Sequence, residues 1–143
     1  MNVIDTISGK HPQLKLVSVT KNRNLSEILS MLKESKVTRI AENRLEEALE
    51  KFPLLPNLEK HFIGKLQSRK IKKIVENFDV IQSVENFEQA QKISKCGKKI
   101  KIMLEINISG KENRSGAKPD EAKKLISEIK KLPNIELIGV MGI

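Results

Sequence analysis

The sequence contains no tryptophan and no tyrosine, and aromatic residues make up only 3% of its 143 positions. Proteins that bind single-stranded nucleic acid stack successive bases on aromatic side chains, which are nearly missing here. The net charge of +9 still favours polyanions, and the cation run Lys65, Arg69, Lys70, Lys72 and Lys73 keeps a basic nucleic-acid-binding module as an alternative. Because the other cations are scattered as on solvated helix faces, we expect nucleic acid not to be the partner.

Cysteine is almost absent as well, since Cys96 is the only one. A lone cysteine forms no intrachain disulfide and no Cys-based metal cluster, which is typical of a reducing compartment. Around His61 there is no second histidine or carboxylate at metal-ligand spacing, so we expect no metal site.

No apolar run approaches the roughly 20 residues that a bilayer span needs, and the opening residues do not have the pattern of a signal peptide. We therefore expect a cytoplasmic protein without a membrane segment. With 38% hydrophobic residues, the chain suits one domain with its own core, residues 1–143.

Short runs rich in valine and isoleucine alternate with amphipathic segments whose apolar residues recur every three or four positions. They predict six strands, at residues 15–20, 37–41, 60–64, 79–84, 100–108 and 135–143. The segments between them predict five helices, at residues 25–35, 44–52, 69–78, 87–96 and 120–132. Two pairs, Asn24 with Glu27 and Asn86 with Gln89, have capping-box spacing, and Gly97 suits a helix exit.

Strand starts recur every twenty residues or more, which allows βαβ crossovers and indicates a parallel sheet. Two arrangements of such a sheet fit the sequence: a doubly wound sheet, the conservative choice at this length, or a (β/α)₈ barrel. No GxGxxG follows the first strand, and "GKENRSGAK" does not have the spacing of a phosphate loop. A nucleotide-binding fold is therefore not favoured.

In both arrangements ligands gather at the carboxyl ends of the strands. The residues there are polar and specific: Lys21, Glu42, Asn43, Gly64, Gln67, Ser68, Ser83, Glu85, Asn107, Ser109 and Met141. Lys21 shares a strand face with Val17 and Val19, so in a barrel it points into the mouth. A desolvated lysine there can form a Schiff base with an aldehyde, although spacing alone favours an ordinary solvated cation.

The other candidates also have structural interpretations. His61 could be a hydrogen-bonded interior histidine, and Gly64 could relieve crowding at a strand end or admit a flat ligand. Asn107 could cap the loop that follows its strand. Each interpretation is reasonable alone, but a whole ring of such residues favours a pocket.

The motifs "LVSVTK", "AENRLEE", "HFIGKLQSRKIK", "INISGKENRSG" and "LIGVMGI" occur in this order from Leu16 to the end of the chain. In these motifs the chain resembles the pyridoxal phosphate homeostasis proteins, relatives of the barrel domain of alanine racemase. The resemblance implies an α/β fold of the (β/α)₈ type that carries pyridoxal 5′-phosphate as an aldimine on Lys21. It further implies that Asn43, His61, Gly64 and Asn107 line the pocket, and that the protein buffers and delivers the cofactor, affecting amino-acid and keto-acid balance, without catalysing a reaction.

Two departures from the family pattern matter. Ala41 occupies a position where the family has glycine. A whole barrel needs about 250 residues, so this chain is expected to be an incomplete barrel that lacks the last two strands, which in the family hold the cofactor's phosphate. We also expect little of the helix that precedes the first strand in relatives.

An unclosed barrel exposes two strand edges and its apolar interior, which favours a homo-oligomer or a partner chain that completes it. A racemase-like enzyme remains the alternative from the enzyme class. It needs an acid or base opposite the lysine, and without tyrosine another chain would have to supply it.

Overall fold

The computed structural model describes residues 3–142. In this range six strands form one parallel sheet: β1 Ser18–Val19, β2 Arg39–Glu42, β3 Glu59–Phe62, β4 Val80–Val84, β5 Ile100–Ile106 and β6 Ile135–Gly142. Their order in the sheet is their order in the chain. A doubly wound sheet reverses its order at a switch point, whereas sequential order with right-handed crossovers keeps every helix on one side. The fold is therefore an incomplete (β/α)₈ barrel, and the doubly wound alternative is wrong.

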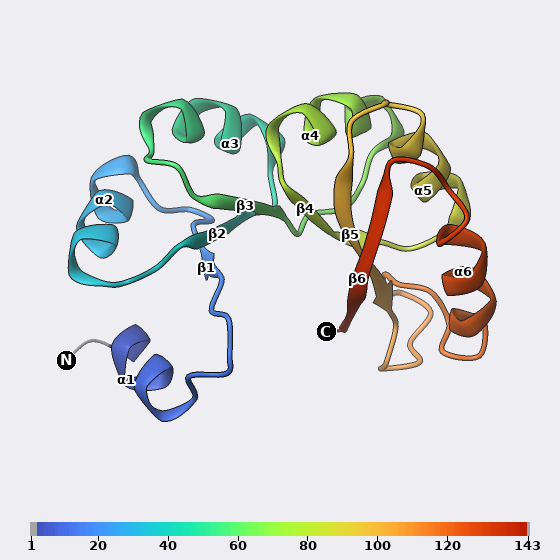
Figure 1. Ribbon diagram of the computed structural model, residues 1–143, viewed down its shortest axis with the longest axis horizontal. Helices are drawn as coiled ribbons and strands as arrows, with labels where there is room; N and C mark the ends of the chain where they lie inside the picture. Colours follow the sequence, from blue (N-terminus) through green and yellow to red (C-terminus); the bar gives the residue numbers. More distant parts are fainter. Residues whose placement is uncertain (1–2, 143) are drawn as a thin grey trace.

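Five helices connect the strands and lie along the outer side of the curved sheet (Figure 1). They are α2 Leu25–Glu34, α3 Leu45–Lys51, α4 Ile71–Asn77, α5 Phe87–Ser94 and α6 Ala122–Ile129. Two short 3₁₀ turns, η1 Phe52–Leu54 and η2 Ser68–Lys70, flank α3 and α4. The predicted capping box of Asn24 and Glu27 is complete. Asn86 caps α5 as predicted, but the Gln89 side chain accepts its hydrogen bond from the backbone of Glu85 instead.

A sixth α-helix, α1 Val3–Lys10, precedes β1. Its apolar residues Val3, Ile4 and Ile7 recur at helical spacing, but the helix is only eight residues long and none of its residues is fully buried. The structure thus has an eight-residue helix before β1, where we expected little of one. Ile4 packs against the edge of the core, next to a groove that residues of α1 and α2 line.

The hydrophobic core lies between the sheet and the outer helices. Ile40, Phe62, Ile81 and Ile102 point to the helix side from neighbouring strands and are almost completely buried. Phe78 makes edge-to-face contacts with Phe52 and Phe62, at centroid distances of 5.1 and 5.2 Å. Burial of about 1.5–3 kcal/mol per large apolar side chain makes this layer the main source of stability.

The inner face of the sheet is only partly covered. Residues of four strands, of the segment before β1 and of the exit of β3 line an apolar cavity of about 290 Å³: Val17, Val19, Ala41, Ile63, Gln82, Met141 and Gly142. Within residues 3–142, β1 and β6 do not pair with each other, so the sheet has two free edges. Val19 is 54% exposed in consequence. β1 is also shorter than predicted, with two residues that pair with β2.

None of the helices in residues 3–142 combines the length and the apolar character that crossing a membrane requires.

Candidate functional site

Lys21 leaves β1 at the carboxyl edge of the sheet and is exposed. Val17 and Val19, which precede it on the same strand face, line the inner cavity as predicted. The next residue, Asn22, adopts a left-handed conformation with φ of 58°, which asparagine tolerates better than most residues. The chain therefore turns sharply at Lys21, beside the mouth of the barrel.

A buried ionic cluster lies next to this turn, and sequence reasoning missed it. The Nζ atom of Lys51, at the end of α3, donates to Oε1 of Glu42 at 2.9 Å and to Oε2 of Glu47 at 3.0 Å. Burial acts to lower the pKa of Lys51, but the hydrogen bonds to Glu42 and Glu47 outweigh it and raise the pKa above its ordinary value. Lys51 thus stays charged inside the fold. Its nine-residue separation from Glu42 has no local periodicity that a sequence pattern could detect.

Asn43 and Gly64 meet at the exits of β2 and β3. A Cβ atom on Gly64 would lie 2.0 Å from the backbone oxygen of Asn43, so the glycine is required by this close approach of two backbones. The hydroxyl of Ser83 donates to the carbonyl of Gly64 at 2.6 Å and fixes it from the other side. Oδ1 of Asn43 is buried and has no hydrogen-bond partner in the described part of the protein. Such an unsatisfied oxygen fits a ligand donor.

His61 lies on the inner face of β3 and is 5% exposed. The amide nitrogen of Gln82 lies 2.8 Å from Nδ1, and Oε1 of Glu59 lies 2.9 Å from Nε2. Both ring nitrogens of His61 thus have a hydrogen-bond partner. Burial acts to raise the pKa of Glu59, but His61, Arg39 and Lys101 together hold it below its ordinary value. His61 therefore supports Gln82, which lines the cavity.

The side chain of Asn107 organises the loop after β5. Its Nδ2 donates to the carbonyl of Lys111 at 2.8 Å, while Oδ1 accepts from the hydroxyl of Ser109 at 2.9 Å and from the amide of Gly110 at 3.1 Å. Gly116 closes the same loop with φ of 106°, where an added Cβ would lie 2.6 Å from the amide nitrogen of Asn107. The side-chain amide of Asn107 is thus hydrogen-bonded within its own loop, as expected if Asn107 caps that loop.

Two carboxylates at the exits of β4 and β5 were not weighed as a pair from the sequence. Glu105 is 5% exposed and accepts from the hydroxyl of Ser115 at 2.7 Å. Oε1 of Glu85 is buried and has no hydrogen-bond partner among the described residues. Burial, and then the charge of Glu105, raise the pKa of the Glu85 carboxyl, while Lys65 opposes them. The exits of β4 and β5 thus bring two carboxylates together at this side of the mouth of the barrel.

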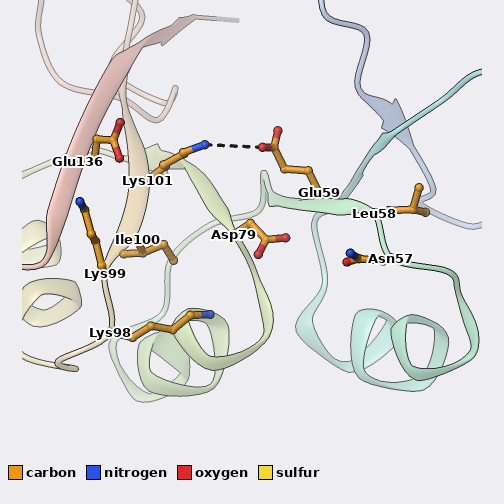
Figure 2. Close-up of a pocket in the computed structure, with 9 residues that line it drawn as sticks. All are labelled: Asn57, Leu58, Glu59, Asp79, Lys98, Lys99, Ile100, Lys101 and Glu136. Atoms are coloured by element: carbon orange, nitrogen blue, oxygen red, sulfur yellow. Dashed lines mark ion pairs between the residues drawn. The ribbon is translucent and has the colours of Figure 1, made fainter.

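The opposite end of the strands holds a hollow of about 590 Å³ (Figure 2). Four of its charged side chains, those of Glu59, Asp79, Lys98 and Lys101, have partners within the protein. Nζ of Lys98 donates to the carbonyl of Val75 at 2.8 Å, and a carboxylate oxygen of Asp79 accepts from the backbone of Lys60 at 2.8 Å. Figure 2 shows the ion pair of Lys101 with Glu59, at 3.8 Å. These contacts tie strands together, so the candidate site is the carboxyl end.

Comparison with known proteins gives a consistent result. The family model described as alanine racemase, N-terminal domain, matches residues 2–143. The chain is 34% identical to the pyridoxal phosphate homeostasis protein of Synechocystis sp. over 97% of its own length and 66% of the relative. It is 33% identical to the protein of the same name from Buchnera aphidicola subsp. Acyrthosiphon pisum, over 92% and 68%. The chain thus spans about two thirds of the length of these relatives.

A solved structure supports the same fold. PipY of Synechococcus elongatus, determined with PLP bound, superimposes with a TM-score of 0.81 at 27% identity. The match covers 99% of this chain and 70% of that one.

Proposed function

The chain belongs to the alanine racemase N-terminal domain family and, within it, to the pyridoxal phosphate homeostasis proteins, and from this premise we propose that it binds pyridoxal 5′-phosphate. We place the cofactor at the carboxyl ends of the strands, where (β/α)₈ barrels hold their ligands. The role proposed is to buffer and deliver the cofactor in the cytoplasm, with effects on amino-acid and keto-acid balance. The relatives are named for homeostasis and not for a reaction, which supports a binding protein in place of an enzyme.

The observation that carries this proposal is the apolar cavity lined by the two valines that precede Lys21. Val17 and Val19 line that cavity and share their strand face with Lys21. A primary amine condenses with an aldehyde such as that of pyridoxal phosphate and releases water, and apolar walls protect the product from hydrolysis. Lys21 is therefore the proposed point of covalent attachment.

The remaining residues are proposed to shape the pocket in different ways. Asn43 offers a buried oxygen that has no partner among the described residues, which fits a donor on the ligand. Gly64 lets the exits of β2 and β3 approach each other. His61 holds Gln82 at the cavity, and Asn107 orders the loop at the rim. Asn43 is thus a direct contact, and the other three act through what they position.

We expect the binding by residues 1–143 to be weak and exchangeable. Barrel phosphate sites form after the seventh and eighth strands, and the sheet in residues 3–142 has six. The described strands supply the amine and the walls of the cavity. Affinity for the phosphate would then come from a homo-oligomer or a partner chain that completes the barrel.

Borohydride reduction in the presence of pyridoxal 5′-phosphate, followed by peptide mass spectrometry, tests the attachment. We expect label on Lys21 in excess of label on Lys99, an exposed lysine at the opposite end of the strands. Lys21→Met should abolish the excess, whereas Lys99→Met should leave it intact. Label spread over surface lysines, with none on Lys21, would contradict the assignment.

A further inference from the structure

We propose that three side chains of the second βα unit, Glu42, Glu47 and Lys51, fix Thr20, from which the turn through Lys21 starts, and so aim the Lys21 amine at the inner cavity. They are positioning residues, since none of them is placed against the cofactor. That Lys21 needs to be aimed follows from the proposed function. The contacts that hold the backbone next to it lie within the protein and do not depend on that function.

The side before Lys21 is held by the buried end of the cluster. Thr20 is 2% exposed, and its amide continues the strand ladder by donating to the carbonyl of Ala41 at 2.9 Å. Its hydroxyl donates to Oε1 of Glu42 at 2.8 Å. Nζ of Lys51 donates to the carbonyl of Thr20 at 3.1 Å. Every polar group of the residue preceding Lys21 is thus tied to β2 or α3.

The turn after Lys21 starts from the same carbonyl that Lys51 bonds. The amide of Arg23 donates to the carbonyl of Thr20 at 3.1 Å, across Lys21 and Asn22. Asn22 has φ of 58°, a conformation that costs energy unless its surroundings enforce it. Lys51 bonds Glu42, Glu47 and Thr20 at once, so one ammonium group ties the start of this turn to β2 and α3.

The energetics favour a geometric role for the buried part of the cluster. The side chain of Glu42 is 0% exposed and that of Lys51 is 13% exposed. A buried ion pair adds little net stability compared with well-packed apolar residues, whereas it fixes the directions of the groups that it bonds. Glu42 bonds Thr20, the residue before Lys21, and is itself the residue before Asn43. It therefore connects the backbone positions of Lys21 and Asn43, the two residues that we propose to contact the ligand.

The test combines Lys51→Met with a matched control. Lys92 on α5 donates to Glu88, four residues earlier, at 2.7 Å, as Lys51 does to Glu47, but it lies away from Lys21. In the borohydride assay we expect Lys51→Met to lower the ratio of Lys21 label to Lys99 label by about tenfold, because small displacements of a reacting group are costly. Lys92→Met should leave the ratio unchanged, and Lys51→Arg should restore part of it.

A second readout needs no cofactor. Hydrogen exchange of the free protein should become faster at the amides of Thr20 and Arg23 in Lys51→Met and remain unchanged in Lys92→Met. The amide of Arg23 reports the turn because it donates to the carbonyl of Thr20 at 3.1 Å. If Lys51→Met does not fold, Glu47→Gln provides a milder variant, which weakens the hold of α3 on the Lys51 ammonium and keeps the bond of Lys51 to Glu42.

The outcomes separate the two proposals. Selective label on Lys21 that persists in Lys51→Met and Glu47→Gln, with unchanged exchange, overturns the positioning role and leaves the proposed function intact. Absence of selective label in the unmodified protein overturns the proposed function, and the exchange rates then decide the positioning role alone.

Discussion

The two faces of the sheet differ in how they are built. On the outer face, side chains such as Ile40, Ile81 and Ile102 are fully buried beneath the helices. On the inner face, His61, Gln82 and Glu59 form a hydrogen-bonded chain, and Val19 remains 54% exposed. The same strands therefore present an apolar, closed face and an open face on which a polar chain lies beside an apolar cavity. Stability is concentrated on the first, and the groups that can do chemistry are concentrated on the second.

The carboxyl edge, where the inner face ends, combines close packing with exposed chemistry. There the exit of β3 presses against that of β2 at Gly64, while Lys21 stays exposed. The two faces therefore differ in how completely they are covered. The strand exits pack closely, as the fit of Gly64 against the backbone of Asn43 shows.

The largest effect is expected for Gly64→Ala. The added methyl group would lie 2.0 Å from the backbone oxygen of Asn43, so β2 and β3 must separate at their exits. We expect a loss of about 3 kcal/mol in the free energy of unfolding, the upper end of overpacking costs. Denaturant unfolding measures it. A loss below about 0.5 kcal/mol would show that the mouth is more pliable than the core.

The same substitution, valine to alanine, should have an intermediate effect on the free energy of unfolding at the outer face and little effect at the inner face. Val84→Ala, in the outer core at 0% exposure, should lower the free energy of unfolding by about 2 kcal/mol. Val19→Ala, on the inner face at 54% exposure, should lower it by less than about 0.5 kcal/mol. Parallel denaturant titrations compare them. Equal losses would mean that the inner face is covered in solution, as by another chain.

The smallest effect concerns the charges of the inner face. The pKa of Glu59 is held below its ordinary value of 4.5, so the ionised carboxylate contributes stability above that pH and loses it as pH falls through the lowered pKa. Glu59→Gln should therefore cost less than about 1 kcal/mol at pH 7, given solvent screening, and nothing at strongly acid pH. Thermal unfolding from pH 7 to pH 3 measures the difference. A constant difference across that range would exclude this linkage.

Much of the fold can be predicted from the sequence because it is recorded in local patterns. The five connecting helices and six strands follow from periodicity, and Asn24 and Glu27 mark the start of α2 by their spacing alone. Helix α1 escapes prediction because it is short and none of its residues is fully buried. The choice of a barrel over a doubly wound sheet is likewise not local, since both use the same βα units and differ only in which strands become neighbours.

At the candidate site the sequence alone determined which groups are present: a lysine after an apolar strand, an asparagine and a glycine at the next two exits, and a histidine two residues before Ile63. Only the tertiary structure decided what each one does. It showed that Gly64 is needed by the backbone of Asn43, that Asn107 is engaged with its loop, and that Lys51 joins Thr20. The physical reason is that hydrogen bonds and close contacts between βα units depend on how strands align across the sheet, and the spacing of residues along one chain does not contain that alignment.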